Sequence, residues 1–305
     1  MTVVGTVISI FLLLFIGYGT KKVRLLKAED ADLLNNVVVY LTLPAFIFEA
    51  IYSYRQPLPL SIAKVPVVGF AMILVVIGAA YLVGKALRLN KPTLAGLMLA
   101  AGFGNTGFLG YPVIKTAFVQ KSALVTAVLY DELAMALPLY TLGAAIASGF
   151  AGERFDRKQA LRVFLLPSMI AIPVALVLRP LTLPQPLLTS IRYLAEGTVP
   201  LVMISLGLSL SARSLKGYAI PVLAACVLKL GLLPLLTYYS LRAGGVNGVM
   251  LQAGVVESGM PSAVMTCVIA QKFGANAKFV AAAIFVSTLL SIAAIPAVLV
   301  MLGVR

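Results

Sequence analysis

A chain of 305 residues that is 61% hydrophobic and 11% charged, with a mean hydropathy of +1.04, is too apolar for a water-soluble domain, which is only about half apolar. The net charge of +14 could indicate a nucleic-acid partner, but the basic residues are scattered over short loops, so a lipid bilayer explains them and nucleic acid does not. Cys226 and Cys267 lie in apolar segments of a chain without histidine, so they indicate neither a disulfide framework nor a metal site.

Ten apolar segments are long enough to cross a membrane, because a helix needs roughly 20 apolar residues to span the hydrocarbon. The first segment lacks the basic stretch that precedes a cleaved signal peptide, so we expect it to remain as a span. The chain is therefore predicted to be an all-α, multi-pass membrane protein. Numbered 1 to 10 in chain order, the predicted spans are 3–20, 33–53, 62–87, 93–119, 122–149, 160–179, 186–211, 217–241, 246–271 and 276–302.

The two halves of the chain, 1–150 and 151–305, hold five predicted spans each. An odd number of spans per half means that the second copy enters the membrane upside down, which gives two inverted five-helix repeats. Prolines recur at corresponding places in the two halves, with Pro44 matching Pro200 and Pro66 matching Pro221.

Basic residues predict the orientation of the spans. Loops after odd-numbered spans hold 15 of them and loops after even-numbered spans hold six, so the positive-inside rule places the odd loops in the cytoplasm and both termini outside the inner or plasma membrane. The 15 are Lys21, Lys22, Arg24, Lys27, Lys85, Arg88, Lys91, Arg154, Arg157, Lys158, Arg162, Arg213, Lys216, Lys272 and Lys278. The six are Arg55, Lys64, Lys121, Arg179, Arg192 and Arg242.

Spans 4 and 9 are each interrupted by a polar, glycine-rich stretch. Span 4 contains GFGNTGFLGYP at 102–112, and span 9 contains ESGMP at 257–261. Laid over each other without gaps, 94–107 and 246–259 share six identities in fourteen positions. Proline and glycine weaken a helix, so both spans are predicted to break, and the two broken helices are predicted to cross near the bilayer midplane.

A break at membrane depth frees backbone groups, which are tolerated only inside protein or against a water-filled cavity. The helix that restarts after a break directs a partial positive charge at the centre of the membrane, where it can hold an anion. The predicted substrate contacts are Asn105, Thr106 and Gly107 in the first break, and Glu257, Ser258 and Gly259 in the second. The alternative is that proline and glycine only kink packed spans, but two matched polar breaks favour a binding site.

Three more ionisable residues are predicted to lie within spans, where they are costly and commonly functional. Asp131 and Glu132 lie in span 5, and Lys229 lies at the centre of span 8. We expect Lys229 to pair with Glu257 or Asp131, either as part of ion coupling or as a structural ion pair. With no histidine in the chain, coupling to protons would have to use a carboxyl group.

Several short motifs follow one another along the chain. They are Leu34-Asn35-Asn36 and Leu43-Pro44 in span 2, the stretch from Asn105 to Pro112 in span 4, Ser205-Leu206-Gly207-Leu208 in span 7, Lys229 and Pro234 in span 8, and Pro261 in span 9. In this order they resemble the auxin efflux carrier family along essentially the whole chain. The resemblance implies a scaffold of spans 1, 2, 6 and 7 and a mobile transport domain of spans 3–5 and 8–10. It matches Asn105 to the asparagine that contacts a substrate carboxylate, and Pro112 and Pro261 to the prolines at the crossover.

The chain departs from that family in two places. Only 149–159 separates spans 5 and 6, where many plant members carry a long hydrophilic loop, and Glu257 stands where a neutral residue would suit an anion better. The second departure leaves room for coupling to H⁺ or Na⁺.

The sequence thus predicts a secondary active or facilitative transporter of small organic anions, either an auxin-like acid or a dicarboxylate such as malate. It would work by alternating access of the elevator type, without catalytic residues, metal or cofactor, and with a possible homodimer through the scaffold helices. A monovalent cation/proton exchanger is the main alternative, and a channel or receptor a further one. An intramembrane hydrolase is excluded, because histidine is absent and Asp131 has no second intramembrane aspartate.

Overall fold

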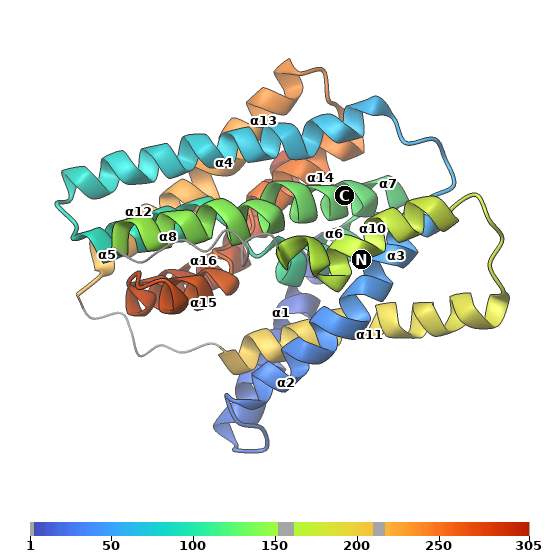
Figure 1. Ribbon diagram of the computed structural model, residues 1–305, viewed down its shortest axis with the longest axis horizontal. Coiled ribbons are helices and arrows are strands. Elements are labelled where there is room, and N and C mark those ends of the chain that lie inside the picture. The colour runs from blue at the N-terminus through green and yellow to red at the C-terminus, as the bar shows by residue number, and fades with distance from the viewer. Residues whose placement is uncertain (1–2, 152–161, 210–216, 305) are drawn as a thin grey trace.

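The computed structural model describes residues 3–151, 162–209 and 217–304, and these residues form helices without any strand (Figure 1). The first half of the chain holds α1 (Val3–Lys22), α2 (Asp30–Val37), η1 (Val38–Thr42), α3 (Leu43–Tyr52), α4 (Leu60–Ala86), α5 (Lys91–Gly102), η2 (Thr106–Gly110), α6 (Tyr111–Ala117), α7 (Lys121–Leu129), η3 (Tyr130–Ala136), η4 (Leu139–Gly143) and α8 (Ala144–Ala151). The second half holds η5 (Arg162–Leu165), α10 (Pro167–Leu178), α11 (Gln185–Ser209), α12 (Ala219–Cys226), η6 (Val227–Leu232), α13 (Leu233–Ala243), α14 (Gly248–Ser258), α15 (Met265–Lys272) and α16 (Ala277–Met301).

Several of these elements are turns of π-helix inside longer helices rather than separate helices. Of the η elements, η5 is a 3₁₀ turn and the others are π-helix. η1 and η6 continue into α-helix at both ends. η3 follows α7 and leads through η4 into α8. Six helices of the described residues are long and apolar enough to cross a membrane. These are Asp30–Tyr52, Leu60–Ala86, Lys121–Phe150, Gln185–Ser209, Ala219–Ala243 and Ala277–Met301.

The all-helical, multi-pass prediction is therefore confirmed, and every predicted span contains helix. Span 1 is the 20-residue α1, span 6 contains the shorter apolar helix α10, and spans 4 and 9 are each split into two helical pieces. The arrangement as ten membrane crossings in two inverted repeats stays a prediction.

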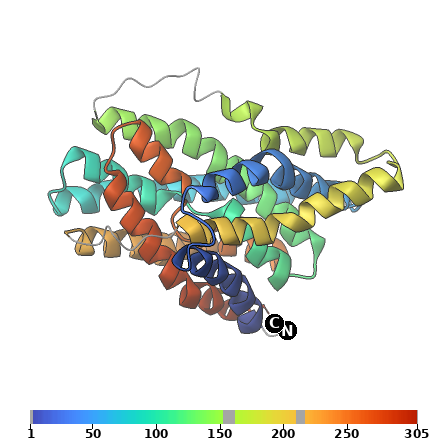
Figure 2. The same cartoon turned by 90° about the horizontal axis from the view of Figure 1, so that it is seen from below.

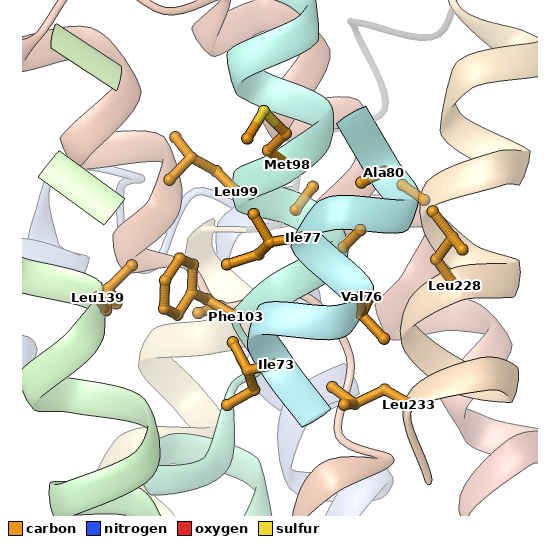
Figure 3. Close-up of a cluster of buried hydrophobic side chains, with 14 of the residues drawn as sticks. Ile73, Val76, Ile77, Ala80, Met98, Leu99, Phe103, Leu139, Leu228 and Leu233 are labelled. Atoms are coloured by element: carbon orange, nitrogen blue, oxygen red, sulfur yellow. The ribbon is translucent and has the colours of Figure 1, made fainter. Parts of the chain in front are cut away.

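Two clusters of buried apolar side chains hold the helices together. The larger one joins α4, α5, α8 and α12–α16, and Figure 3 shows its centre, where Ile73 and Ile77 of α4 meet Phe103 after α5 and Leu139 of η4. The second joins α1, α3, α6, α10 and α11 to one side of α7, α14 and α16. In Figure 1, α1, α2 and α11 lie at the bottom of the view, and α4 and α13 lie at the top.

Helices α1 and α11 approach each other so closely that their crossing depends on glycine. A Cβ on Gly17 of α1 would lie 2.8 Å from the Cα of Ile204, and a Cβ on Gly207 of α11 would lie 2.7 Å from the backbone nitrogen of Tyr18. Each glycine thus faces the backbone of the opposite helix, as small residues do where membrane helices pack.

The predicted orientation in the membrane rests partly on residues outside those that the structure describes, namely Arg154, Arg157, Lys158, Arg213 and Lys216. The start of α1 and the end of α16 lie near each other in both views, and Figure 2 shows them together at the lower edge of the molecule (Figures 1 and 2). Which side of the membrane that end faces stays a prediction.

Candidate functional site

The first predicted break is present between α5 and η2. Helix α5 ends at Gly102, and its C-cap Phe103 is extended, with φ −105° and ψ 128°. Helical structure restarts as η2 at Thr106, after the cap residue Asn105. Glycine supplies no side chain to pack at 102 and 104, so the helix gains little from continuing there.

The second predicted break lies between α14 and α15. Helix α14 ends at Ser258, and its C-cap is Gly259, whose N–H bonds to the carbonyl groups of Val255 and Val256 at 3.0 and 3.1 Å. Regular helix resumes only at Met265.

The two breaks meet and pair as short antiparallel extended segments. Gly104 stands opposite Ser262, the Asn105 N–H donates to the Pro261 carbonyl at 2.7 Å, and the Ala263 N–H donates to the Phe103 carbonyl at 3.0 Å. The Ser262 hydroxyl adds a bond to the Ala100 carbonyl at 2.7 Å. Backbone groups of each break are therefore hydrogen-bonded to backbone groups of the other. The sequence had led us to expect these groups to be free for a ligand, and they are not.

The two prolines assigned to the crossover have different places. Pro261 lies within it, since its carbonyl accepts from Asn105. Pro112 is in the first turn of α6, beyond η2, where the missing N–H of proline is tolerated. The first helix is thus ended by glycine rather than by Pro112.

Three glycines spaced three residues apart along the first break each face one buried ionisable side chain. A Cβ on Gly104 would lie 2.8 Å from Lys229 Nζ, and one on Gly107 would lie 2.9 Å from Asp131 Oδ2. A Cβ on Gly110 would overlap the carboxyl group of Glu257. We call Gly104, Gly107 and Gly110 the glycine row. It lets charged groups from η6, η3 and α14 reach the backbone of the first break.

Asp131 occupies the start of η2, where a ligand anion was expected. Its Oδ1 accepts from the Thr106 hydroxyl, and its Oδ2 faces Gly107. The N–H groups of a first helical turn lack partners within the helix and favour negative charge. Thr106 and Gly107 therefore serve the protein's own carboxylate.

The predicted ion pair between Lys229 and Glu257 or Asp131 is not formed. Lys229 is fully buried, and its Nζ donates to the Ser258 carbonyl at 2.5 Å. In the part of the chain that the structure describes, the pair of opposite charges within 4.0 Å is Arg192 with Glu49, at 3.4 Å. The ammonium group is held instead by the carbonyl end of α14, which carries a partial negative charge.

Two buried polar side chains of the breaks themselves have no hydrogen-bond partner, at Nδ2 of Asn105 and at both carboxyl oxygens of Glu257. The hydroxyl groups of Tyr111 and Tyr130 beside the crossing have none either. Asn105 is 6% exposed and Glu257 is 0% exposed. The Ser258 hydroxyl, by contrast, is taken up by the Val255 carbonyl of its own helix at 2.7 Å. Unpaired buried polar groups are costly, so Asn105 and Glu257 are the residues best placed to receive a solute or a proton.

Glu132 points away from the crossing. It is buried, and its Oε2 accepts from the Ser168 hydroxyl of α10 at 3.2 Å. The two neighbouring carboxyl groups on η3 thus serve different contacts, Asp131 in the crossing and Glu132 at α10. Both lie in π-helix, as does Lys229 in η6, and π-turns are frequent at functional sites.

Sequence reasoning missed Gly104, Gly110, Ser168 and Ser262 as parts of this region. The spacing of three residues between Gly104, Gly107 and Gly110 is a signal that could have indicated the glycine row. No comparable pattern marks Ser168 or Ser262, whose partners lie far away in the chain.

The crossing is closed to solvent in this structure. Glu257, Ser258 and Lys229 are 0% exposed, and Asp131 is 7% exposed. An apolar cavity of about 140 Å³ lies elsewhere, between α1 and α16, and an open pocket of about 510 Å³ lies beside Lys91 and α8. Among the described residues no three His, Cys, Asp or Glu side chains are grouped to hold a metal ion.

Comparison with known proteins shows which proteins this chain is similar to. Residues 2–301 match the family described as "Membrane transport protein". An uncharacterized transporter of Methanocaldococcus jannaschii is 32% identical over 299 residues, which cover 96% of both chains. One of Methanothermobacter thermautotrophicus is 31% identical over 294 residues, or 95% of both. A protein of Rhizobium meliloti named "Putative malonate transporter" is 28% identical over 316 residues, or 97% of this chain and 95% of that one.

Proposed function

We propose that this chain, which belongs to the membrane transport protein family, carries small organic anions across the membrane by alternating access. Family and relatives indicate a transporter and not an enzyme, and they confirm the resemblance drawn from the sequence. The observation that carries the proposal is the pairing of the two helix breaks around Asn105, whose side-chain N–H₂ is buried without a partner. Such a donor suits a carboxylate, because charge-assisted hydrogen bonds are the stronger ones.

The substrate class we propose is a small carboxylate, with dicarboxylates ahead of auxin-like acids. The name of the Rhizobium meliloti relative supports a dicarboxylate, and the compact crossing supports a small solute. Asn105 would bind one carboxylate. Lys229 of η6 would contribute positive charge beside the second break, since its Nζ lies 2.5 Å from the Ser258 carbonyl.

We further propose an elevator movement of spans 3–5 and 8–10 against a scaffold of spans 1, 2, 6 and 7. The larger apolar cluster supports this division, since it draws on α4, α5, α8 and α12–α16 and on none of α1, α3, α10 and α11. Those four helices pack in the second cluster against α6 and against one side of α7, α14 and α16, which would be the surface between the two parts. A homodimer through the scaffold would leave the moving part free. From the distribution of basic residues over the loops we also propose that both termini lie outside the cell.

A monovalent cation/proton exchanger remains the second candidate. The observation that favours it is the excess of carboxyl groups, since Asp131, Glu132 and Glu257 are all buried and only Lys229 is a buried base in the same region. In that case Asp131 and Glu257 would bind the cation.

Transport by the purified protein in liposomes separates these candidates. We expect labelled malonate, malate or indole-3-acetate to exchange against the same unlabelled acid inside. Exchange of none of the three, together with a sodium or potassium gradient driving proton movement, would replace the anion carrier by the exchanger. Protein-free liposomes measure leakage of the free acids.

A further inference from the structure

We propose that Glu257 binds and releases one proton in each transport cycle, so that the organic anion moves together with H⁺. The inference rests on the proposed function and names its coupling ion. It starts from the position of Glu257 in the last turn of α14, one residue before the break.

The carboxyl group of Glu257 is enclosed by protein. The side chain is 0% exposed, neither oxygen receives a hydrogen bond, and the carboxyl lies against Gly110, where a Cβ would overlap it. Ionisation of a carboxyl group in such surroundings is strongly unfavourable, whereas the protonated group carries no charge. The tight contact with Gly110 leaves no space for a metal ion on that side.

The charges around Glu257 lead to the same conclusion. The charged groups that act on it are Asp131 of η3 and Lys229 of η6. Asp131 accepts from the Thr106 hydroxyl, whereas neither oxygen of Glu257 has a hydrogen-bond partner. The charge of Lys229 acts on Glu257, but its Nζ donates to the Ser258 carbonyl and forms no ion pair with the carboxyl group. Two carboxylates and one ammonium group would leave a net negative charge at the crossing, which an entering anion would meet unless Glu257, the carboxyl without a hydrogen-bond donor, were protonated.

Other titratable groups that face Glu257 do not supply a base. Tyr130 of η3 and Tyr111 of α6 interact electrostatically with Glu257, and both are buried. The remaining elements packed on α14 also carry ionisable side chains, but the charges that act on Glu257 are those of Asp131 and Lys229. The others are Lys64, Tyr81 and Lys85 of α4, Lys121 of α7, Glu132 of η3, Tyr238, Tyr239 and Arg242 of α13, and Lys278 of α16.

Glu257 and Asn105 are close enough to act together. The Gly110 N–H donates to the Asn105 carbonyl at 3.2 Å, so the carboxyl resting on Gly110 lies one helical turn from Asn105. We infer that protonation of Glu257 permits a carboxylate at Asn105. On the other side of the membrane, the anion departs and the O–H bond of Glu257 breaks, releasing the proton to water.

Malonate accumulation in liposomes tests this coupling. With membrane voltage clamped, and with both sides between about pH 7 and pH 8 so that malonate stays a dianion, one proton per anion predicts about a tenfold change in accumulation per pH unit across the membrane. A dye trapped inside should report acidification when malonate enters. Glu257→Gln should lose both responses, with malonate–malonate exchange slowed but measurable. Glu29→Gln, at an exposed position of the same residue type, should behave as wild type.

The outcomes separate the two levels of the argument. Exchange that persists in the wild type while accumulation ignores the pH gradient, or follows a sodium gradient instead, would overturn proton coupling and leave the carrier standing. Exchange of none of malonate, malate and indole-3-acetate would overturn the carrier itself. The dye measurement on the wild type decides the question even where Glu257→Gln does not fold.

Discussion

At the scale of single residues, the glycine row is what allows charge to approach the crossing. Lys229, Asp131 and Glu257 come from three different elements, and each reaches the first break at a position without a Cβ. A buried charge needs a polar partner. For Lys229 that partner is a backbone group, the carbonyl of Ser258.

Gly107→Ala should therefore slow transport without unfolding the protein. The added Cβ would lie 2.9 Å from Asp131 Oδ2, so the carboxylate has to move away from Thr106. A displacement of this kind at a binding site is expected to lower the exchange rate by about tenfold or more. Gly78→Ala on α4 is the matched control, because no atom lies within 4 Å of its Cβ position. Equal exchange rates for the two variants would remove the Gly107–Asp131 contact from the mechanism.

Asn105→Ala should weaken anion binding more than it changes stability. The Asn105 Nδ2 has no partner to lose within the protein, so truncation removes a donor from the substrate alone. Loss of one bond to a charged group corresponds to about 1.5–3 kcal/mol, or roughly a tenfold to hundredfold rise in the half-saturating malonate concentration. Thermal unfolding in detergent should stay close to that of the wild type. A large fall in unfolding temperature with unchanged half-saturation would assign Asn105 a structural role.

At the scale of elements, the sequence predicted both breaks in helices but not how they are satisfied. Glycine and proline weaken a helix wherever they stand, so the interruptions near 104 and 258 follow from composition. The bond from Asn105 to the Pro261 carbonyl depends on where the second half of the chain folds, which no local pattern records. The same limit explains why the ion pair predicted for Lys229 was wrong. The prediction considered only side chains of opposite charge, whereas the partner of Lys229 is a backbone carbonyl at the end of α14.

The crossing of α1 and α11 makes a second element-scale prediction. Gly17→Ala should destabilise the protein, because the new Cβ would lie 2.8 Å from the Ile204 Cα and force the helices apart. Overpacking of this kind costs about 1–3 kcal/mol. Gly19→Ala, two residues along the same helix and with nothing within 4 Å, should be neutral or stabilising by up to about 1 kcal/mol. Unfolding temperatures in one detergent compare the pair. A neutral Gly17→Ala would contradict the close crossing.

At the scale of the whole molecule, the family match extends over residues 2–301, and each of the two apolar clusters of the described residues draws on helices from both halves of the chain. Membrane orientation was predicted from counts of Lys and Arg alone, because the distribution of these residues over the loops sets the orientation, and no contact within the fold records it.

Labelling from outside tests that orientation. In a background with Cys226→Ala and Cys267→Ala, a membrane-impermeant maleimide should modify Gln56→Cys in intact cells. Lys27→Cys should react only after permeabilisation, since Lys27 lies in the first basic loop. Both side chains are exposed in the structure, so access is limited by the membrane alone. The reverse labelling pattern would invert the topology.

The backbone bonds between Phe103–Asn105 and Pro261–Ala263 set a rule for how such a carrier can open. Separating the two breaks would leave several peptide groups without hydrogen-bond partners in a medium that contains no water to replace them. The joint has to travel as one piece. In the proposed elevator movement, this piece would slide along the helices around it, and the hydrogen bond between Glu132 and Ser168 would have to break as it moved.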